Sequence, residues 1–164
     1  MNLNINKYIY KMNIAIKIKD FDVKNLIISE KCKNNVMPHS FFYRFYYSDD
    51  SFISNGLSIS FNIKNINIEK YYTKIKCHFK KNDHNTEIIK LLSNIENDIL
   101  KQFNINSKPT HRLKEQLSQY FIKLFNDEYH KFKNLDNLEI LLKISGMWLT
   151  NNEYGLTFRF YFVK

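Results

Sequence analysis

"LSISFNIK", residues 57–64, alternates apolar and polar side chains without a break. In a strand, Leu57, Ile59, Phe61 and Ile63 would point to one side and the residues between them to the other. This strict alternation predicts a half-buried strand, with one face on a core and the other facing solvent. It is the clearest strand signal in the chain, and similar patterns occur before and after it.

Strands are also predicted over residues 41–47, 71–80, 139–149 and 154–163, with one or two more within residues 11–29. Residues 86–125 instead place apolar side chains at helical spacing, and Pro109 marks the start of a second helix within them. The four residues "TNNE" (150–153) predict a short loop between the last two strands.

This element order matches the OB-fold, a five-stranded, partly open barrel with its helix between the third and fourth strands. We therefore predict a mainly β protein with two helices (α+β) and an OB-fold-like five-stranded barrel, in the order β-β-β-α-α-β-β with an extra N-terminal strand. An open antiparallel sheet packed on a helical pair has the same order and stays an alternative. With 164 residues and no turn-rich linker, residues 1–164 are expected to form one domain.

The formal net charge of +9 is the feature of the composition that bears on function, because clustered Lys and Arg attract phosphates. The chain is also rich in Asn, Ile and Lys, whose codons are AT-rich, so only the placement of the charges can support nucleic-acid binding. No apolar run reaches the roughly 18 residues needed to span a bilayer. Together with two isolated cysteines, Cys32 and Cys77, this predicts a soluble, intracellular protein without a membrane partner.

Catalytic motifs are missing from the sequence. Glycine occurs only at positions 56, 146 and 155, which excludes a glycine-rich phosphate loop. The five histidines lack metal-ligand spacing, and the adjacent Asp49 and Asp50 are typical of a turn. We expect no enzyme, no metal and no cofactor, with a metal site assembled from separate loops left open.

Single-stranded nucleic acid is held by a positively charged groove and by aromatic rings on which bases stack. An OB-fold binds with the outer face of its second and third strands and with the loops between strands 1 and 2 and strands 4 and 5. Residues of these types occur on the predicted outer faces and beside the last loop. The candidate nucleic-acid-binding residues are Phe42, Arg44, Tyr46, Asn62, Lys64, Tyr72, Lys74, Lys76, Lys80, Trp148, Tyr154, Arg159 and Tyr161.

Each of these residues also has a structural interpretation. The Lys and Tyr row of residues 72–80 is equally typical of a solvated strand face. Trp148 could pack in the core, and Arg159 could pair with an acid on a neighbouring strand. In "FFYRFYY" (41–47), one set of alternate residues must be core, and the other set is a stacking surface only if nothing covers it.

The stretch "LLKISGMWLTNNEYGLTFRFYF", residues 141–162, resembles the C-terminal segment of single-stranded-DNA-binding proteins of large DNA viruses. In that family a Gly-Trp-containing strand leads through a short polar loop to a "GLT" strand. The resemblance covers about an eighth of the chain and implies an OB-fold. Such proteins often end in an acidic tail that recruits replication partners, whereas this chain ends in "FRFYFVK", so recruitment would need another surface.

Two functions are compatible with these patterns. The first is a sequence-tolerant single-stranded-DNA-binding protein that coats exposed strands in viral DNA replication, recombination or repair. Its further candidate partners are RNA, a second copy of the chain and replication proteins. Its expected place of action is the viral replication site in host cytoplasm or nucleus. The second is a structural or interaction protein, such as a small virion component, whose positive charge is compositional.

Overall fold

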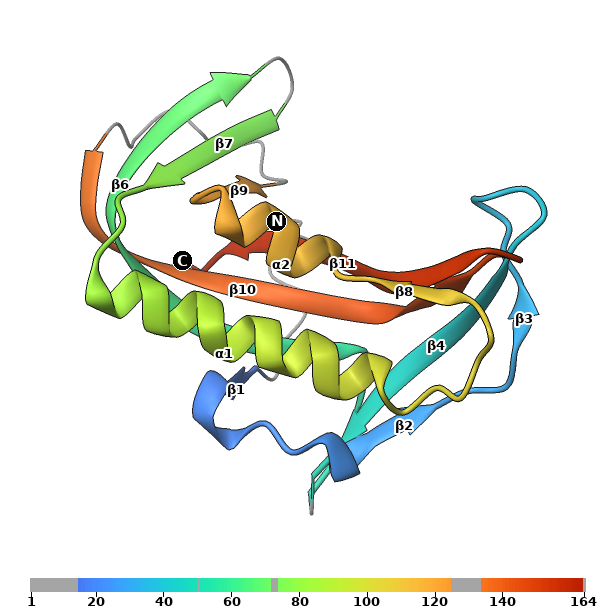
Figure 1. The fold of residues 1–164 in the computed structure, drawn as a ribbon. Helices are drawn as coiled ribbons and strands as arrows, with labels where there is room; N and C mark the ends of the chain where they lie inside the picture. The colour runs from blue at the N-terminus through green and yellow to red at the C-terminus, as the bar shows by residue number, and fades with distance from the viewer. Residues whose placement is uncertain (1–14, 50, 72–73, 125–133, 164) are drawn as a thin grey trace, which may run out of the picture.

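The computed structural model describes residues 15–49, 51–71, 74–124 and 134–163 (Figure 1). Its helices are α1 (Asp83–Leu100) and α2 (Arg112–Ser118), together with two single-turn 3₁₀ helices at Ile18–Asp20 and Val23–Asn25. Its strands are β1 (Ile16–Lys17), β2 (Leu26–Ile28), β3 (Cys32–Lys33), β4 (Phe41–Ser48), β5 (Ile53–Asn55), β6 (Leu57–Tyr71), β7 (Lys74–Phe79), β8 (Lys108–Thr110), β9 (Phe121–Leu124), β10 (Asn134–Leu149) and β11 (Glu153–Phe162).

Five of these strands close into a barrel. β6 pairs with β7, β7 with β9, β9 with β11, β11 with β10, and β10 returns to β6. The pairings are antiparallel except that between β9 and β11, which is parallel. The predicted fold class, a mainly β protein with two helices and an OB-fold-like five-stranded barrel, is confirmed.

The long strand β6 reaches two neighbours because it bends. Leu57, Ile59, Phe61 and Ile63 are all buried, as the alternation predicts. Asn65 then adopts a left-handed backbone conformation with φ of 55°, and the next buried residues are Ile66 and Ile68. The set of side chains that faces the core therefore changes at Asn65, and the second half of β6 pairs with β7.

The aromatic strand β4 lies outside the barrel, contrary to the prediction that residues 41–47 form its first strand. Phe41–Arg44 pair with Leu149–Gly146 of β10, beyond the part of β10 that pairs with β6. The change of partner coincides with a register shift between Ile144 and Gly146 on β10. The other edge of β4 pairs with β2 and β3, which lie in or near the segment expected to add strands.

The third barrel strand, β9, comes from a segment predicted to be helical. Leu117, Tyr120, Phe121 and Leu124 fit helical spacing, but α2 ends at Ser118 and Tyr120 has a left-handed φ of 54°. Residues 121–124 then alternate as a strand, with Ile122 and Leu124 fully buried. Both helices therefore lie between the second and third barrel strands, and not between the third and fourth.

The helices complete the core on one side of the barrel (Figure 1). α1 buries the residues of its predicted apolar face, including Ile88, Leu92 and Ile99, and α2 buries Leu113 and Leu117. The side chain of Asn82 caps α1 by accepting a hydrogen bond from the backbone N–H of Asn85. These residues belong to the same buried cluster as the barrel interior.

Asn85 fastens the start of α1 to the barrel. Its side chain is fully buried; it accepts a hydrogen bond from the Lys64 backbone N–H and donates to the carbonyl oxygens of Lys64 and Lys80, all within 2.8–2.9 Å. These two residues flank the bend of β6 and the end of β7. One buried amide thus satisfies three backbone groups at the point where β6 changes direction.

Replacing Asn85 by Ala should lower the free energy of unfolding by about 3 kcal/mol, because it leaves buried backbone groups without partners. Urea denaturation of the two proteins measures the difference. Asn94→Ala, at an exposed position of the same helix, is the matched control and should stay within about 0.5 kcal/mol of the wild type. Equal stability of the Asn85 and Asn94 variants would contradict this role.

Candidate nucleic-acid interface

The outer face of β7 and β9 carries basic and aromatic side chains. On β7, Ile75, Cys77 and Phe79 are buried, so Lys76 and His78 point outward. On β9, burial of Ile122 and Leu124 turns the alternate residues, Phe121 and Lys123, to the same outer side. β7 and β9 are the second and third barrel strands in chain order, which are the strands that OB-folds use for binding.

Phe121 is the centre of this outer face. The Lys76 ammonium lies 4.4 Å from the centroid of its ring, and the Lys123 ammonium lies 5.9 Å away. The imidazole of His78 is 6.1 Å from the same ring, centroid to centroid. An aromatic ring is thus surrounded by two cations and one titratable group, which is the combination that binds stacked bases and their phosphates.

The strand registers align four basic residues across the barrel. Lys76 on β7 faces Lys123 on β9, and the parallel pairing of Leu124 with Phe160 puts Lys123 beside Arg159 on β11. Arg159 in turn faces Lys143 on β10. We call Lys76, Lys123, Arg159 and Lys143 the cationic row; with strands about 4.8 Å apart it spans roughly 14 Å.

Like charges directly opposite each other repel, and Lys76 and Lys123 are such a pair. An anionic chain lying along the cationic row would remove this repulsion and gain from each contact. One edge carries an acid, since Glu69 of β6 faces Lys76 and its carboxylate lies 3.6 Å from His78 Nε2. The acid sits at one end of the row.

Several predicted site residues come together on this surface, and others do not. Lys76, Arg159 and Tyr161 lie on it, with Tyr161 two residues beyond Arg159 on β11. Lys80 is exposed just after β7. Tyr72 and the side chain of Lys74 lie outside the described residues.

Asn62 and Lys64 are exposed on the outer side of β6 but face Glu139 and Asn137 of β10. The carbonyl of Asn62 is 3.0 Å from His84 Nε2 of α1, and the backbone of Lys64 is bound by Asn85. Their backbone groups are thus occupied in joining β6 to α1. Because Asn62 faces the acid Glu139, this pair is a weaker phosphate surface than the cationic row.

The aromatic strand β4 has one buried and one open side. Phe45 and Tyr47 are buried in the core, and Tyr43 and Phe45 both pack on Phe103, with ring centroids 5.4 and 6.2 Å away. The alternate residues Phe42, Arg44 and Tyr46 point to the other side, where Arg44 is exposed and the two rings are half-buried. Among the described residues, β2 and β3 pair with the edge of β4.

Trp148 and Tyr154 were predicted as open stacking residues, and their burial corrects this prediction. Their exposed fractions are 4% and 5%. Tyr154 packs in the core, with its ring centroid 6.3 Å from that of Phe103. Trp148 lies on the outer side of β10, where the guanidinium of Arg112 covers it at 4.4 Å from the ring.

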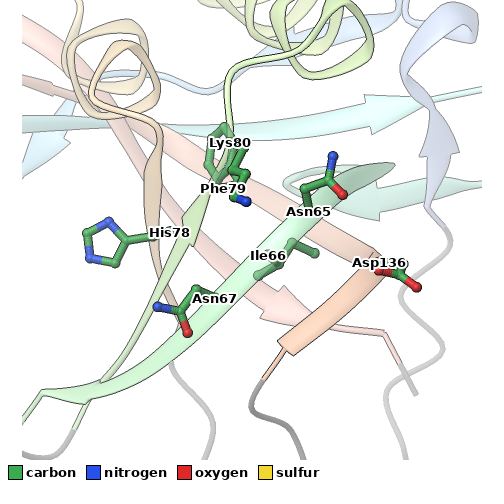
Figure 2. A pocket seen from close by; sticks show the side chains of 7 residues that line it. All are labelled: Asn65, Ile66, Asn67, His78, Phe79, Lys80 and Asp136. Carbon is green, nitrogen blue, oxygen red and sulfur yellow. The ribbon is translucent and has the colours of Figure 1, made fainter.

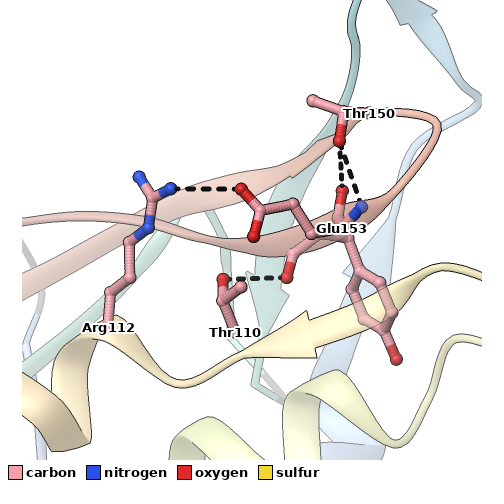
Figure 3. Close-up of polar contacts among 5 residues, drawn as sticks. Thr110, Arg112, Thr150 and Glu153 are labelled. Atoms are coloured by element: carbon pink, nitrogen blue, oxygen red, sulfur yellow. Dashed lines mark hydrogen bonds and ion pairs between the residues drawn. The ribbon is translucent and has the colours of Figure 1, made fainter.

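The loop after Trp148 is held to β8 and the start of α2 (Figure 3). Thr150 Oγ1 donates to the carbonyl of Glu153 at 2.9 Å, and Thr110 Oγ1 donates to the carbonyl of Tyr154 at 3.0 Å. The Glu153 carboxylate lies 3.7 Å from Arg112 Nη2. The predicted loop at residues 150–153 is therefore present, and its neighbours fix where Arg112 lies.

Four basic or aromatic residues of this surface were missed by the sequence interpretation. Phe121 and Lys123 were assigned to a helix, although the alternation of "FIKL" (121–124) was a usable signal. Lys143 lies in a predicted strand, but its alignment with Arg159 depends on a register that no local pattern encodes. Arg112 meets Trp148 only through the tertiary fold.

Glu96 is a fully buried acid that holds the start of α2. Its Oε1 accepts a hydrogen bond from the Leu113 backbone N–H, and its Oε2 accepts one from Lys114, both at 2.9 Å. Burial raises the pKa of the Glu96 carboxyl group, and these two hydrogen bonds oppose the rise. Arg112 directly precedes Leu113 and Lys114, whose backbone N–H groups bind Glu96. Glu96 therefore helps to position the Arg112 guanidinium over Trp148.

Because the pKa of Glu96 is raised on folding, its favourable contribution to stability is complete below the pKa of the unfolded chain and is lost as the pH rises through the folded value. The free energy of unfolding of the wild type, relative to Glu96→Gln, should therefore fall between about pH 4 and neutral pH. Urea denaturation at several pH values tests this. A relative stability that increases with pH would show that the two hydrogen bonds outweigh desolvation.

A polar pocket of about 350 Å³ borders the interface where β6, β7 and β10 meet (Figure 2). It shares His78 with the surface around Phe121. Its lining residues are Asn65, Ile66, Asn67, His78, Phe79, Lys80 and Asp136. Amides, an imidazole, an ammonium and a carboxylate thus surround a hollow beside the cationic row.

Metal-binding clusters, membrane-spanning helices and reactive thiols are the remaining features that bear on function. In the part of the chain that the structure describes, no cluster of three or more His, Cys, Asp or Glu side chains could hold a metal, and no helix is long and apolar enough to cross a membrane. Cys32 is exposed, whereas burial raises the pKa of the Cys77 thiol to about 12, so Cys77 stays protonated at neutral pH.

Comparisons of the chain with protein-family models, with curated proteins and with solved structures gave no match.

Proposed function

We propose that this protein binds single-stranded DNA without strong sequence preference and coats exposed strands during DNA replication, recombination or repair. The observation that carries the proposal is the Phe121 ring beside a row of four basic residues across β7, β9, β11 and β10. Stacking on aromatic rings tolerates any base, and backbone phosphates are the same at every position. The resemblance of residues 141–162 to viral proteins of this class supports a viral setting.

Fluorescence polarisation with labelled oligo-dT and a matching duplex, each at two salt concentrations, tests the proposal. The protein should prefer the single strand and bind it more weakly at high salt, because phosphate contacts release counterions. No binding at low salt, or equal affinity for the duplex, would overturn it.

Removing the Phe121 ring should cost about 1–3 kcal/mol of binding, the range for one base stacked on an aromatic side chain. Phe121→Ala should therefore bind oligo-dT roughly 5- to 150-fold more weakly than the wild type. Because Phe121 is only half-buried, urea denaturation should show a folded variant. Unchanged affinity in a folded Phe121→Ala protein would remove the stacking role.

Reversing two charges of the row, Lys76→Glu with Lys123→Glu, should weaken binding further and flatten its salt dependence. Each lost phosphate contact should lower the slope of log K against log salt by about 0.7 for a single strand. Lys90→Glu with Lys101→Glu, at exposed positions on α1 and just after it, makes the same change of charge outside the row. Equal losses in the two double variants would mean that only net charge matters.

A second candidate, an interaction protein, is favoured by large apolar side chains exposed around β4. Ile27, Phe41 and Ile53 are 40–65% exposed on β2, β4 and β5. This function predicts concentration-dependent oligomers without nucleic acid, which sedimentation velocity would detect. It also predicts that Lys74, Lys76 and Lys80 can be changed to Glu without loss of assembly.

A further inference from the structure

Two aromatic rings lie flat on the outer side of β4 and β10, each over a glycine. A Cβ at Gly146 would collide with the ring of Phe42, and a Cβ at Gly155 would lie 2.9 Å from Cζ2 of Trp148. Phe42 and Trp148 face each other across β4 and β10. The two glycines thus allow two adjacent rings to sit close to the sheet.

The outer surface between these rings and Phe121 is covered by small residues. Thr157 of β11 faces Gly146 of β10, and Gly146 faces Arg44 of β4. β9 pairs with β11 in parallel at Leu124 and Phe160, and this register, continued by three residues, places Phe121 beside Thr157. A line from Phe121 to Arg44 therefore crosses Thr157 and then reaches the Phe42 ring, which covers Gly146.

Two arginines flank the far end of this line. Arg44 is exposed, and Arg112 lies over Trp148 with half of its side chain exposed. The 3.7 Å contact of Arg112 with Glu153 joins two groups that are about half-exposed, and such surface pairs contribute little. A phosphate can therefore replace Glu153 as the partner of Arg112, and its bidentate contact is the stronger one.

We propose that a strand bound at Phe121 continues over Thr157 to a second contact site, formed by Phe42, Arg44 and Arg112. Phe42 stacks a base there, and the two arginines bind phosphates on either side of it. This inference rests on the proposed function and gives the bound strand a direction, across the strands of the barrel and onto β4. The occupant is single-stranded DNA, because the site combines a half-buried ring with two cations.

The separation of the two sites makes the inference testable by oligonucleotide length. Phe121 and Phe42 lie on β9 and β4, three strand spacings apart, or roughly 14 Å across the sheet. A dinucleotide of dT is shorter than this separation, because neighbouring nucleotides are about 3.4 Å apart when stacked and about twice that when extended, so it should be held by the Phe121 surface alone. One of about 16 nucleotides should reach both sites.

The double variant Arg44→Gln with Arg112→Gln should bind the 16-mer of dT about tenfold more weakly and bind the dinucleotide as the wild type does. Its salt slope for the 16-mer should fall by about 1.4, from two lost phosphate contacts. Phe42→Ala should show the same dependence on length. Lys90→Gln with Lys101→Gln is the matched control and should leave both affinities unchanged.

Trp148 reports on the second site because it is the only tryptophan of the chain and lies under Arg112. The 16-mer should change its fluorescence, and the dinucleotide should not. Equal losses of affinity for both lengths, or no loss for the 16-mer, would overturn the second site while leaving the Phe121 surface in place. If the proposed function itself is wrong, the result is different, because the wild type would then bind neither oligonucleotide.

Discussion

One edge of β10 is shared by two strands, and the rest of the molecule depends on this sharing. Residues 134–144 of β10 pair with β6 and close the barrel, whereas residues 146–149 pair with β4. The register shift beside Gly146 separates the two parts, and no side chain fits there because the carbonyl of Tyr43 and the ring of Phe42 occupy the space. A barrel and an attached aromatic strand are thereby joined in one continuous outer surface.

That surface brings together residues that are distant in sequence. Lys76, Lys123, Arg159 and Lys143 come from four strands, and Phe42 and Arg112 come from β4 and the start of α2. The barrel supplies rigid backbone, and its alternation sends every second side chain outward. The candidate binding surface therefore follows from strand register more than from any local motif.

Most strands could be predicted from the sequence, because a period of two is a local property. Leu57–Ile63 and Ile75–Phe79 alternate as expected, and the loop at residues 150–153 lies where its composition indicates. The barrel membership of β9 was not predictable in the same way, since "FIKL" is short and follows a helix with compatible spacing. Arg159 was identified as a candidate, but its neighbours Lys123 and Lys143 depend on long-range pairing. Trp148 was identified as a candidate binding residue, but Arg112 covers its ring. Only the tertiary fold brings this arginine near, so the sequence could not indicate the contact.

The pairing of β4 also has a consequence for how the chain folds. "FFYRFYY" (41–47) is bonded along both edges in the native state, so it offers no free edge to another copy. One of its partners, Gly146–Leu149, lies about a hundred residues later in the chain. During synthesis the apolar, strand-forming segment 41–47 therefore cannot complete its pairing until the C-terminal hairpin has been made. Contacts of such long range form slowly. In the native protein β4 is protected from edge-to-edge association, whereas in the nascent chain it is exposed to it until the last strands emerge.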